Sequence, residues 1–181
     1  MGTLKTTNIQ SISGSGTVTL GTSGETFAVG TGVSTQLCRP AFRVYNNADQ
    51  TISDSTWTKI TLDTEEYDTN AAFGSNKFTV PANLGGKYFL CLQTAPHVST
   101  DYRRVIGAVY KNGSIVNTIK SQIQMNSTLF NDGETIQTIT GVLDLAAADY
   151  IEGYGYVYSP SGGTIKFAAG QCCLQGFRIG D

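Results

Sequence analysis

Charged side chains are scarce in this sequence of 181 residues. Asp, Glu, Lys and Arg make up only 14% of it, whereas an average soluble domain has about 25%. The net charge is -2, and Lys and Arg form no cluster. Proteins that bind nucleic acid usually present such a cluster to the phosphates, so we expect no nucleic acid partner. A run of about 18 apolar residues is also absent, so we expect no insertion into a membrane.

Histidine is equally scarce, and this bears on catalysis. His97 is the single histidine, so any Ser-His-Asp triad would have to use it, and no Gly-x-Ser-x-Gly turn accompanies it. The pairs Gly85-Gly86 and Gly162-Gly163 are typical of turns, because no helix start follows them to receive a phosphate. We therefore expect a protein that is not an enzyme, with no catalytic residue and no cofactor.

Cysteine is limited to Cys38, Cys91, Cys172 and Cys173. Cys172 and Cys173 are neighbours on an expected strand, so their side chains leave opposite faces and cannot both bind one zinc ion. A domain of this size does not need disulfides. We interpret the four as buried free thiols, with a zinc site or a Cys38–Cys91 disulfide as the alternatives.

Four acidic residues lie close together at Asp63, Glu65, Glu66 and Asp68. Carboxylate oxygens are suitable calcium ligands, but the spacing is not that of an EF-hand loop. Strand alternation would also separate Glu65 from Glu66 across the two faces. We interpret the group as a solvated strand end and expect no metal site, with calcium as the alternative.

Glycine and alternating patterns are what the sequence has in abundance. It contains 21 glycines, and strict alternation runs from Tyr150 to Tyr158. Four tyrosines and Glu152 share one face of this segment, while the other face carries Ile151, Gly153, Gly155 and Val157. A period of two residues predicts a β-strand and fits no helix.

Similar short apolar runs, separated by turn residues, predict about ten strands over the rest of the chain. Residues 56–62, which include the single tryptophan Trp57, are expected to form a strong strand. Asn112-Gly113 between alternating runs predicts a tight hairpin. Residues 172–179 predict a last strand that is locked inside a sheet, with Phe177 and Ile179 on one of its faces. The pattern indicates an all-β sandwich or barrel.

Residues 1–38 form a separate region built mainly of Thr, Ser and Gly. Brief alternations, such as those at residues 17–20 and 26–29, provide too little apolar surface for a core. We interpret this region as an N-terminal arm whose short strands pair with a neighbouring protein, and a disordered leader is the alternative. Arg39-Pro40 marks the boundary, because proline readily starts an edge strand. The head domain is then expected at residues 39–181.

Several blocks of the head, in order, resemble a known family. They read PAFRVYNNADQTIS, TWTKITLDTEEYD, NKFTVPANLGGKYFLCLQT, YKNGS, AADYIEGYGYVYS and LQGFRIG. The set is similar to the jelly-roll heads of the complement-one-q and tumour-necrosis-factor superfamily. The sequence departs from the family pattern in two places. Cys173-Leu174 replaces the usual aromatic pair, and Gly153 and Gly155 leave the penultimate strand with few side chains on one face. The leader LKTTNIQSISGSGTVTLGTSGET is similar to those of virion proteins from tailed bacteriophages.

The first resemblance implies a ten-stranded jelly-roll sandwich that assembles as a homotrimer. Packing the tyrosine face against another subunit would remove a large aromatic area from water. We expect the trimer interface to contain Tyr88, Tyr154, Tyr156, Tyr158, Phe177 and Ile179.

The second resemblance implies a structural protein localised in the virion and attached to another virion protein through residues 1–38. The expected function is host recognition of the tail-fibre type, through binding of a surface glycan or protein. The alternative is a capsid decoration (cement) protein that stabilises the head shell. For host recognition, the receptor-binding loops are expected to contain Asn46, Asn47, Tyr67, Asn70, Phe73, His97 and Tyr102.

Overall fold

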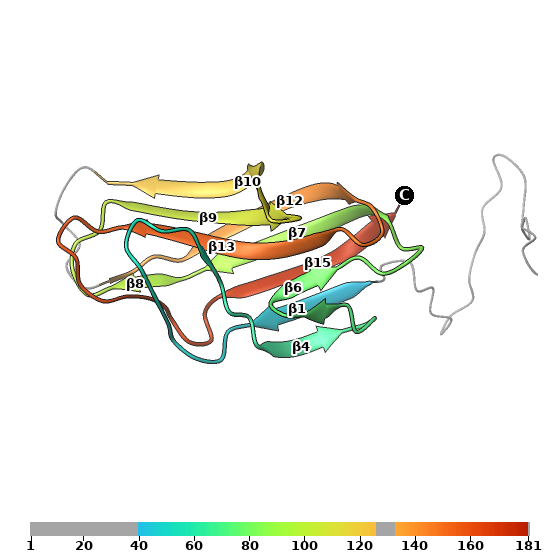
Figure 1. Ribbon diagram of the computed structural model, residues 1–181, viewed down its shortest axis with the longest axis horizontal. Helices are drawn as coiled ribbons and strands as arrows, with labels where there is room; N and C mark the ends of the chain where they lie inside the picture. The colour runs from blue at the N-terminus through green and yellow to red at the C-terminus, as the bar shows by residue number, and fades with distance from the viewer. Residues whose placement is uncertain (1–39, 126–132, 181) are drawn as a thin grey trace, which may run out of the picture. The chain divides into compact units, whose positions relative to one another are not determined.

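The computed structural model describes residues 40–125 and 133–180, and these contain fifteen strands and no helix (Figure 1). The all-β prediction is confirmed for this part of the chain. The expected arm at residues 1–38, which includes Cys38, lies outside the described residues. The division into an arm and a head therefore stays a prediction.

One sheet has five antiparallel strands, with the last strand of the chain at its centre. In spatial order the strands are β12 (Gln137–Leu145), β7 (Gly86–Thr94), β15 (Cys173–Gly180), β1 (Ala41–Tyr45) and β4 (Thr64–Asp68). β15 pairs with β7 on one side and with β1 on the other. The expectation that the terminal strand is locked inside a sheet is confirmed.

The second sheet has six strands and carries the tyrosine-rich segment. Its strands are β10 (Ser114–Gln124), β9 (Arg104–Lys111), β13 (Tyr150–Tyr158), β6 (Lys77–Thr79) and β5 (Phe73–Gly74), with β3 (Thr58–Lys59) also paired to β13. β13 has the bounds that the alternation predicts. β9 and β10 are joined at Asn112 and Gly113, whose φ angles of 51° and 76° are those of the predicted tight hairpin.

A third, smaller sheet consists of β11 (Gly133–Glu134), β8 (Pro96–Val98), β14 (Ile165–Phe167) and β2 (Gln50–Ile52). The longer strands of the other two sheets run along a common direction in Figure 1. Those two sheets pack face to face. The ring of Phe42 in β1 stacks on the ring of Phe78 in β6, with centroids 4.2 Å apart. A sandwich of two antiparallel sheets with one shared core results.

Glycine on the inner face of β13 makes room for large side chains from across the core. A Cβ atom added at Gly153 would lie 2.7 Å from Leu92, and one added at Gly155 would lie 2.5 Å from Phe167. Real Cβ atoms do not approach other atoms this closely, so the two glycines are required by packing. This packing explains why the sequence places glycine, with no side chain, at these two positions of the strand.

The count of about ten strands is not confirmed, because the fifteen include several of only two or three residues. The strong strand expected at residues 56–62 is reduced to β3. There the side chain of Gln50 replaces ladder bonds, since its Nε2 donates to Lys59 O (2.9 Å) and its Oε1 accepts from Thr61 N (2.8 Å). Ile60 and Leu62 still enter the core.

Candidate binding surfaces

The outward face of β13 carries a cluster of aromatic rings. Tyr154 and Tyr156 are half-buried and Tyr158 is exposed, while Gly155 and Val157 between them face the core. Tyr110 of β9 stacks on Tyr154 with ring centroids 3.9 Å apart. Trp57, just before β3, has its ring 5.9 Å from that of Tyr110 and 5.6 Å from that of Tyr156. We call the set the aromatic surface: Trp57, Tyr110, Tyr154, Tyr156 and Tyr158.

Polar side chains border the aromatic surface on both sides. The register places Arg104 of β9 between Gln124 of β10 and Tyr158 of β13. On the other side, Lys59 Nζ lies 2.7 Å from Glu152 Oε1. Rings thus alternate with groups that donate or accept hydrogen bonds. Such a mixture suits contact with a polar ligand better than contact with another subunit, because the core of a protein–protein interface is usually depleted of charge.

Two hydroxyl groups of the aromatic surface have shifted pKa values. Burial raises the pKa of Tyr110, and the neighbouring Tyr154 adds to the increase. Burial also raises the pKa of Tyr154, with smaller contributions from Glu152 and Tyr150. Both hydroxyls therefore stay protonated at neutral pH and can donate a hydrogen bond as well as accept one.

The outward face of the five-stranded sheet carries a different, purely apolar group. The register places Val142, Phe89 and Phe177 in one row across β12, β7 and β15. The rings of Phe89 and Phe177 have centroids 5.4 Å apart. Val142 is 53% exposed, Phe177 39% and Ile179 51%. We call Phe89, Val142, Phe177 and Ile179 the apolar patch.

The six residues expected at a trimer interface do not form one surface. Tyr154, Tyr156 and Tyr158 lie on the outward face of the six-stranded sheet, whereas Phe177 and Ile179 lie on that of the five-stranded sheet.

The assignment of Tyr88 to the interface is wrong. Its side chain is 0% exposed and packs in the core, where its hydroxyl donates to Leu84 O (2.5 Å). Its parity in β7 places it inside the sandwich, whereas Phe89 beside it points out.

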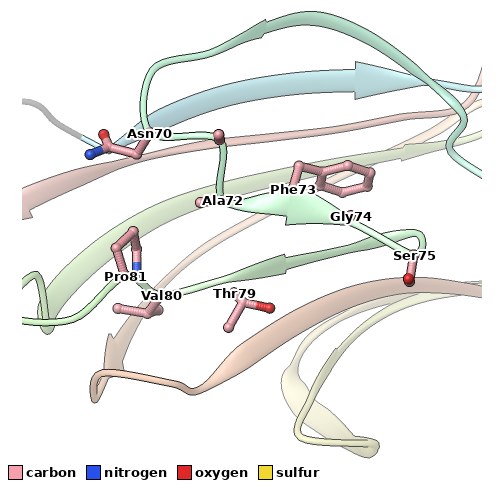
Figure 2. Close-up of a pocket in the computed structure, with 9 residues that line it drawn as sticks. Asn70, Ala72, Phe73, Gly74, Ser75, Thr79, Val80 and Pro81 are labelled. Atoms are coloured by element: carbon pink, nitrogen blue, oxygen red, sulfur yellow. The ribbon is translucent and has the colours of Figure 1, made fainter.

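The expected receptor-binding residues are likewise dispersed. Asn70 and Phe73 lie near the start of β1, since Thr69 N donates to Ala41 O (3.0 Å). Both line a pocket between the β4–β5 loop and the end of β6 (Figure 2). Phe73 is only half-buried, with its ring 6.3 Å from that of Phe42. The main chain of this loop is held by Asp68, whose Oδ2 accepts from Ala72 N and Phe73 N.

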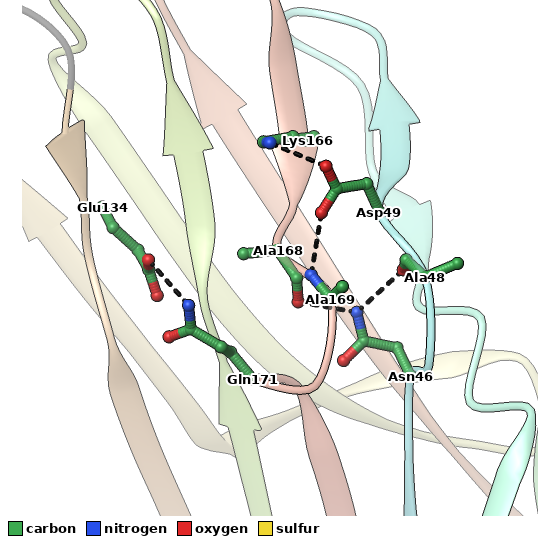
Figure 3. Close-up of polar contacts among 8 residues, drawn as sticks. All are labelled: Asn46, Ala48, Asp49, Glu134, Lys166, Ala168, Ala169 and Gln171. Carbon is green, nitrogen blue, oxygen red and sulfur yellow. Dashed lines mark hydrogen bonds and ion pairs between the residues drawn. The ribbon is translucent and has the colours of Figure 1, made fainter.

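Asn46 and Asn47 lie at the opposite end of β1, and the prediction for Asn46 is wrong. Asn46 is 1% exposed. Its Nδ2 donates to Ala168 O (2.7 Å), and its Oδ1 accepts from Cys172 N (2.8 Å). Figure 3 shows this side chain among contacts that join the β1–β2 and β14–β15 connections. Asn46 therefore has a structural role, while Asn47 is exposed and its assignment stays a prediction.

The same junction contains an ion pair and an amide contact. Lys166 Nζ lies 2.7 Å from Asp49 Oδ2, and Ala169 N donates to Asp49 Oδ1 (2.9 Å). These interactions lower the pKa of Asp49, with Lys166 as the largest cause. Gln171 Nε2 donates to Glu134 Oε2 (3.0 Å) (Figure 3). The contacts fix the loops rather than form a site.

The remaining three of the expected loop residues lie elsewhere. Tyr102 is 3% exposed and belongs to the core, with its hydroxyl hydrogen-bonded to Thr135 Oγ1, so its assignment to a receptor contact is wrong. His97 is half-buried in β8 between β11 and β14, so it is a strand residue and not a loop residue. Tyr67 is 46% exposed but lies on β4.

Three of the four acidic residues at 63–68 have separate partners. Asp63 Oδ1 accepts from Asn47 N (2.8 Å), Glu66 Oε2 lies 2.5 Å from Arg43 Nε, and Asp68 binds the loop that follows it. Within residues 40–125 and 133–180, no three His, Cys, Asp or Glu side chains could hold a metal ion. In the same ranges no helix has the length and hydropathy of a membrane span.

The three described cysteines are buried free thiols. Cys172 faces the core, where its Sγ accepts from Ala95 N (3.3 Å), and burial raises its pKa to about 12. Cys173 belongs to the other face of β15, as strand alternation predicts. Burial raises its pKa as well, while Arg43 lowers it. Neither thiol has the lowered pKa of a nucleophile.

Sequence reasoning missed several residues of both surfaces and one at their border, namely Trp57, Phe89, Tyr110 and Val142, with Arg104 at the border. Alternation in the segment Arg104–Lys111 could have placed Tyr110 with Arg104 on one face. The contact between Trp57 and Tyr156 depends on long-range strand pairing, for which the local pattern holds no signal.

Comparison with known proteins gives a fold and no family. No family model matches the chain, and no curated protein matches it. The chain is similar in structure to Eiger TNF from S. frugiperda, with 14% identity, 79% of this chain and 95% of that chain covered, and a TM-score of 0.56. The globular domain of zebrafish complement 1qA protein matches with 18% identity, 78% and 98% coverage, and a TM-score of 0.47. The described residues thus have a TNF-like jelly-roll fold.

Proposed function

We propose that this protein is a non-enzymatic, homotrimeric knob on a bacteriophage virion, attached through residues 1–38 and used for host recognition in the manner of a tail-fibre tip. The apolar patch is the observation that supports self-association. The virion assignment is supported by the composition of residues 1–38 and their similarity to phage leaders.

The apolar patch suits contact with other copies because its side chains carry no polar group that would lose hydrogen bonds to water on burial. Phe177, Ile179 and Val142 are 39% to 53% exposed and lie on regular strands. Covering each would gain on the order of 1 kcal/mol, since full burial of such a side chain is worth about 1.5–3 kcal/mol. Contiguous apolar area on a rigid sheet is typical of a protein interface.

The aromatic surface is less suited to the same contact. Its rings keep hydroxyl groups and border Arg104 and Lys59. The outward faces of two packed sheets also point in opposite directions. Association through both faces would extend an open fibre rather than close a ring of three. We assign the subunit contact to the apolar patch and leave the aromatic surface free.

Substitution in the apolar patch tests the assembly. Phe177→Asp should change the mass in size-exclusion chromatography with light scattering from that of three chains to that of one, because a charge cannot be buried there without a partner. Thr138→Asp is the matched control, since Thr138 is exposed on the same face of β12 but lies opposite Gln93, away from the patch. An unchanged trimer in the Phe177 variant would refute the assigned interface.

Location in the particle tests the biological role. Antibody labelling of intact virions should place the protein at the tail, and virions without it should lose adsorption while their capsids stay intact. Labelling on the head shell, with capsids that break more easily when the protein is missing, would instead support the capsid decoration function.

A further inference from the structure

Two arginines at one end of the aromatic surface have no counter-ion among the described residues. Arg103 and Arg104 line a pocket together with Gln124, Met125 and Tyr158. Their Nε atoms are buried, and no described residue accepts a hydrogen bond from either. A buried donor without an acceptor is unfavourable, and an anionic group would satisfy two such donors at once.

Four other cations among the described residues do have such partners. Arg43, Lys59, Lys111 and Lys166 each lie within 2.8 Å of a carboxylate oxygen. Among the described residues, the ion pairs include neither Arg103 nor Arg104. The positive charge at this end of the six-stranded sheet is therefore available to a ligand, and the chemistry of guanidinium favours carboxylate, sulfate or phosphate.

The rings continue from the arginine pocket along the sheet. Tyr158 lines the pocket, and Tyr156 and Tyr154 follow at every second residue of β13. Trp57 and Tyr110 widen the row. Consecutive side chains on one face of a strand lie about 6.6 Å apart, so the row offers a series of ring faces and hydroxyl edges to an extended ligand. A saturated sugar ring has an apolar C–H face that packs on such rings, and its hydroxyls suit the exposed amides of Gln122 and Gln124.

We propose that the aromatic surface and the Arg103–Arg104 pocket together bind an acidic oligosaccharide, with the arginines on its anionic substituent and the rings on its sugar faces. The inference deepens the proposed host-recognition function and rests on it for the biological source of the glycan. It moves the receptor contact from the loops to a sheet face.

A second copy of the chain and a nucleic acid are the competing occupants. A second copy would bring apolar area, which fits the apolar patch better than a row bordered by unpaired cations. A single-stranded nucleic acid would also use rings and arginines, but its backbone needs cations along its whole length, whereas both arginines lie at one end of the row. Three copies in one knob would multiply a weak single-site affinity for a repeating glycan.

Trp57 provides a direct measurement, because it is the single tryptophan and lies within the surface. The full-length protein is titrated with oligogalacturonate, oligosialic acid and a heparin oligosaccharide, with maltohexaose as the neutral probe and oligo(dT) as the nucleic acid probe. At least one acidic sugar should change the Trp57 emission in a saturable, salt-sensitive way, and maltohexaose and oligo(dT) should not.

Two variants locate the site. Arg104→Gln should weaken the acidic sugar about tenfold or more, since a charge-assisted hydrogen bond is lost. Tyr156→Ala should weaken it as well. Lys166→Gln removes a cation from β14 of the third sheet, outside both the aromatic surface and the apolar patch, and should leave affinity unchanged. Unfolding midpoints are measured for each variant, and the salt dependence of the unaltered protein tests the charge contact should Arg104→Gln not fold.

The proposal is overturned when none of the three acidic probes binds, when maltohexaose or oligo(dT) binds as well as they do, or when neither variant weakens binding. Light scattering on the same samples keeps the outcomes separate. Binding by a protein that is not trimeric would refute the proposed assembly and leave the glycan site standing. A trimer that binds none of the acidic probes would refute the glycan site and leave the proposed assembly standing.

Discussion

The buried hydroxyl of Tyr88 makes the stability of the protein depend on pH in the alkaline range. It is fully buried with its hydroxyl on Leu84 O, and burial raises its pKa to about 12, while the nearby Arg178 lowers it. An acid whose pKa is raised in the folded state gives full stability below the unfolded pKa of about 10. That stability is lost as pH rises from about 10 to about 12, at up to about 1.4 kcal/mol per pH unit.

Tyr88→Phe should therefore flatten the alkaline part of the stability profile, measured by urea unfolding from about pH 9 to about pH 12. At neutral pH the variant should lose about 1 kcal/mol, because Leu84 O is left without its donor. The comparison is between the two profiles, since Cys172 also has a raised pKa and contributes to both. Parallel profiles for the two proteins would contradict the role of Tyr88.

Gly155 tests how tightly the two sheets pack. A Cβ atom there would lie 2.5 Å from the ring of Phe167, which is fully buried and cannot move away freely. Gly155→Val should lower the free energy of unfolding by about 1–3 kcal/mol or more, as overpacking does. Thermal unfolding measures it, and Gly74→Val is the matched control, because a Cβ atom at Gly74 meets no atom within 4 Å and its φ is not positive.

At the scale of the elements, alternation predicted which residues share a face but not which face is inside. β13 has its predicted bounds, and its tyrosines share one face as expected. The expectation that Tyr88 points outward is wrong, since Phe89 is the outward residue of that pair. The segment itself contains the signal, because the polar residues Lys87 and Gln93 share the face of Phe89 and not that of Tyr88.

Loop residues were harder to predict, since their environment depends on distant segments. Asn46 resembles an exposed loop amide in sequence, yet Ala168 and Cys172 enclose it across more than 120 positions of the chain. The polar environment of β3 depends in the same way on the side chain of Gln50. Such contacts cannot be predicted from the local composition of the sequence or from the period of its apolar residues.

The β4–β5 loop depends on one carboxylate. Asp68 Oδ2 accepts from Ala72 N (2.6 Å) and Phe73 N (2.7 Å), and Oδ1 accepts from Asn70 N (3.1 Å). Asp68→Ala should destabilise the protein by about 1–3 kcal/mol, since three backbone donors lose a charged acceptor. Amide hydrogen exchange should accelerate at residues 70–73 more than in β7. Glu65→Ala, on an exposed residue of the same strand, should change neither quantity.

At the scale of the whole molecule, the two packed sheets keep two kinds of surface apart, because each surface lies on the outward face of a different sheet. The apolar patch and the aromatic surface lie on opposite sheets, so one can be covered by other subunits while the other stays in water. This division follows from the even period of strands, which sends alternate side chains either into the shared core or out of it. The proposed glycan site and the proposed subunit contact can then vary independently in sequence.

The described residues of the expected head form a core of their own, with Phe42 and Leu174 among its members. We therefore predict that deleting residues 2–37 leaves a folded trimer that no longer joins the virion. Circular dichroism and light scattering measure the fold and the mass, and purified particles are assayed for incorporation. The Phe177→Asp variant provides the complementary case, because it retains the leader and should lose the trimer. Normal incorporation of the truncated chain would contradict the anchoring role of residues 1–38, and loss of folding would show that the head is not autonomous.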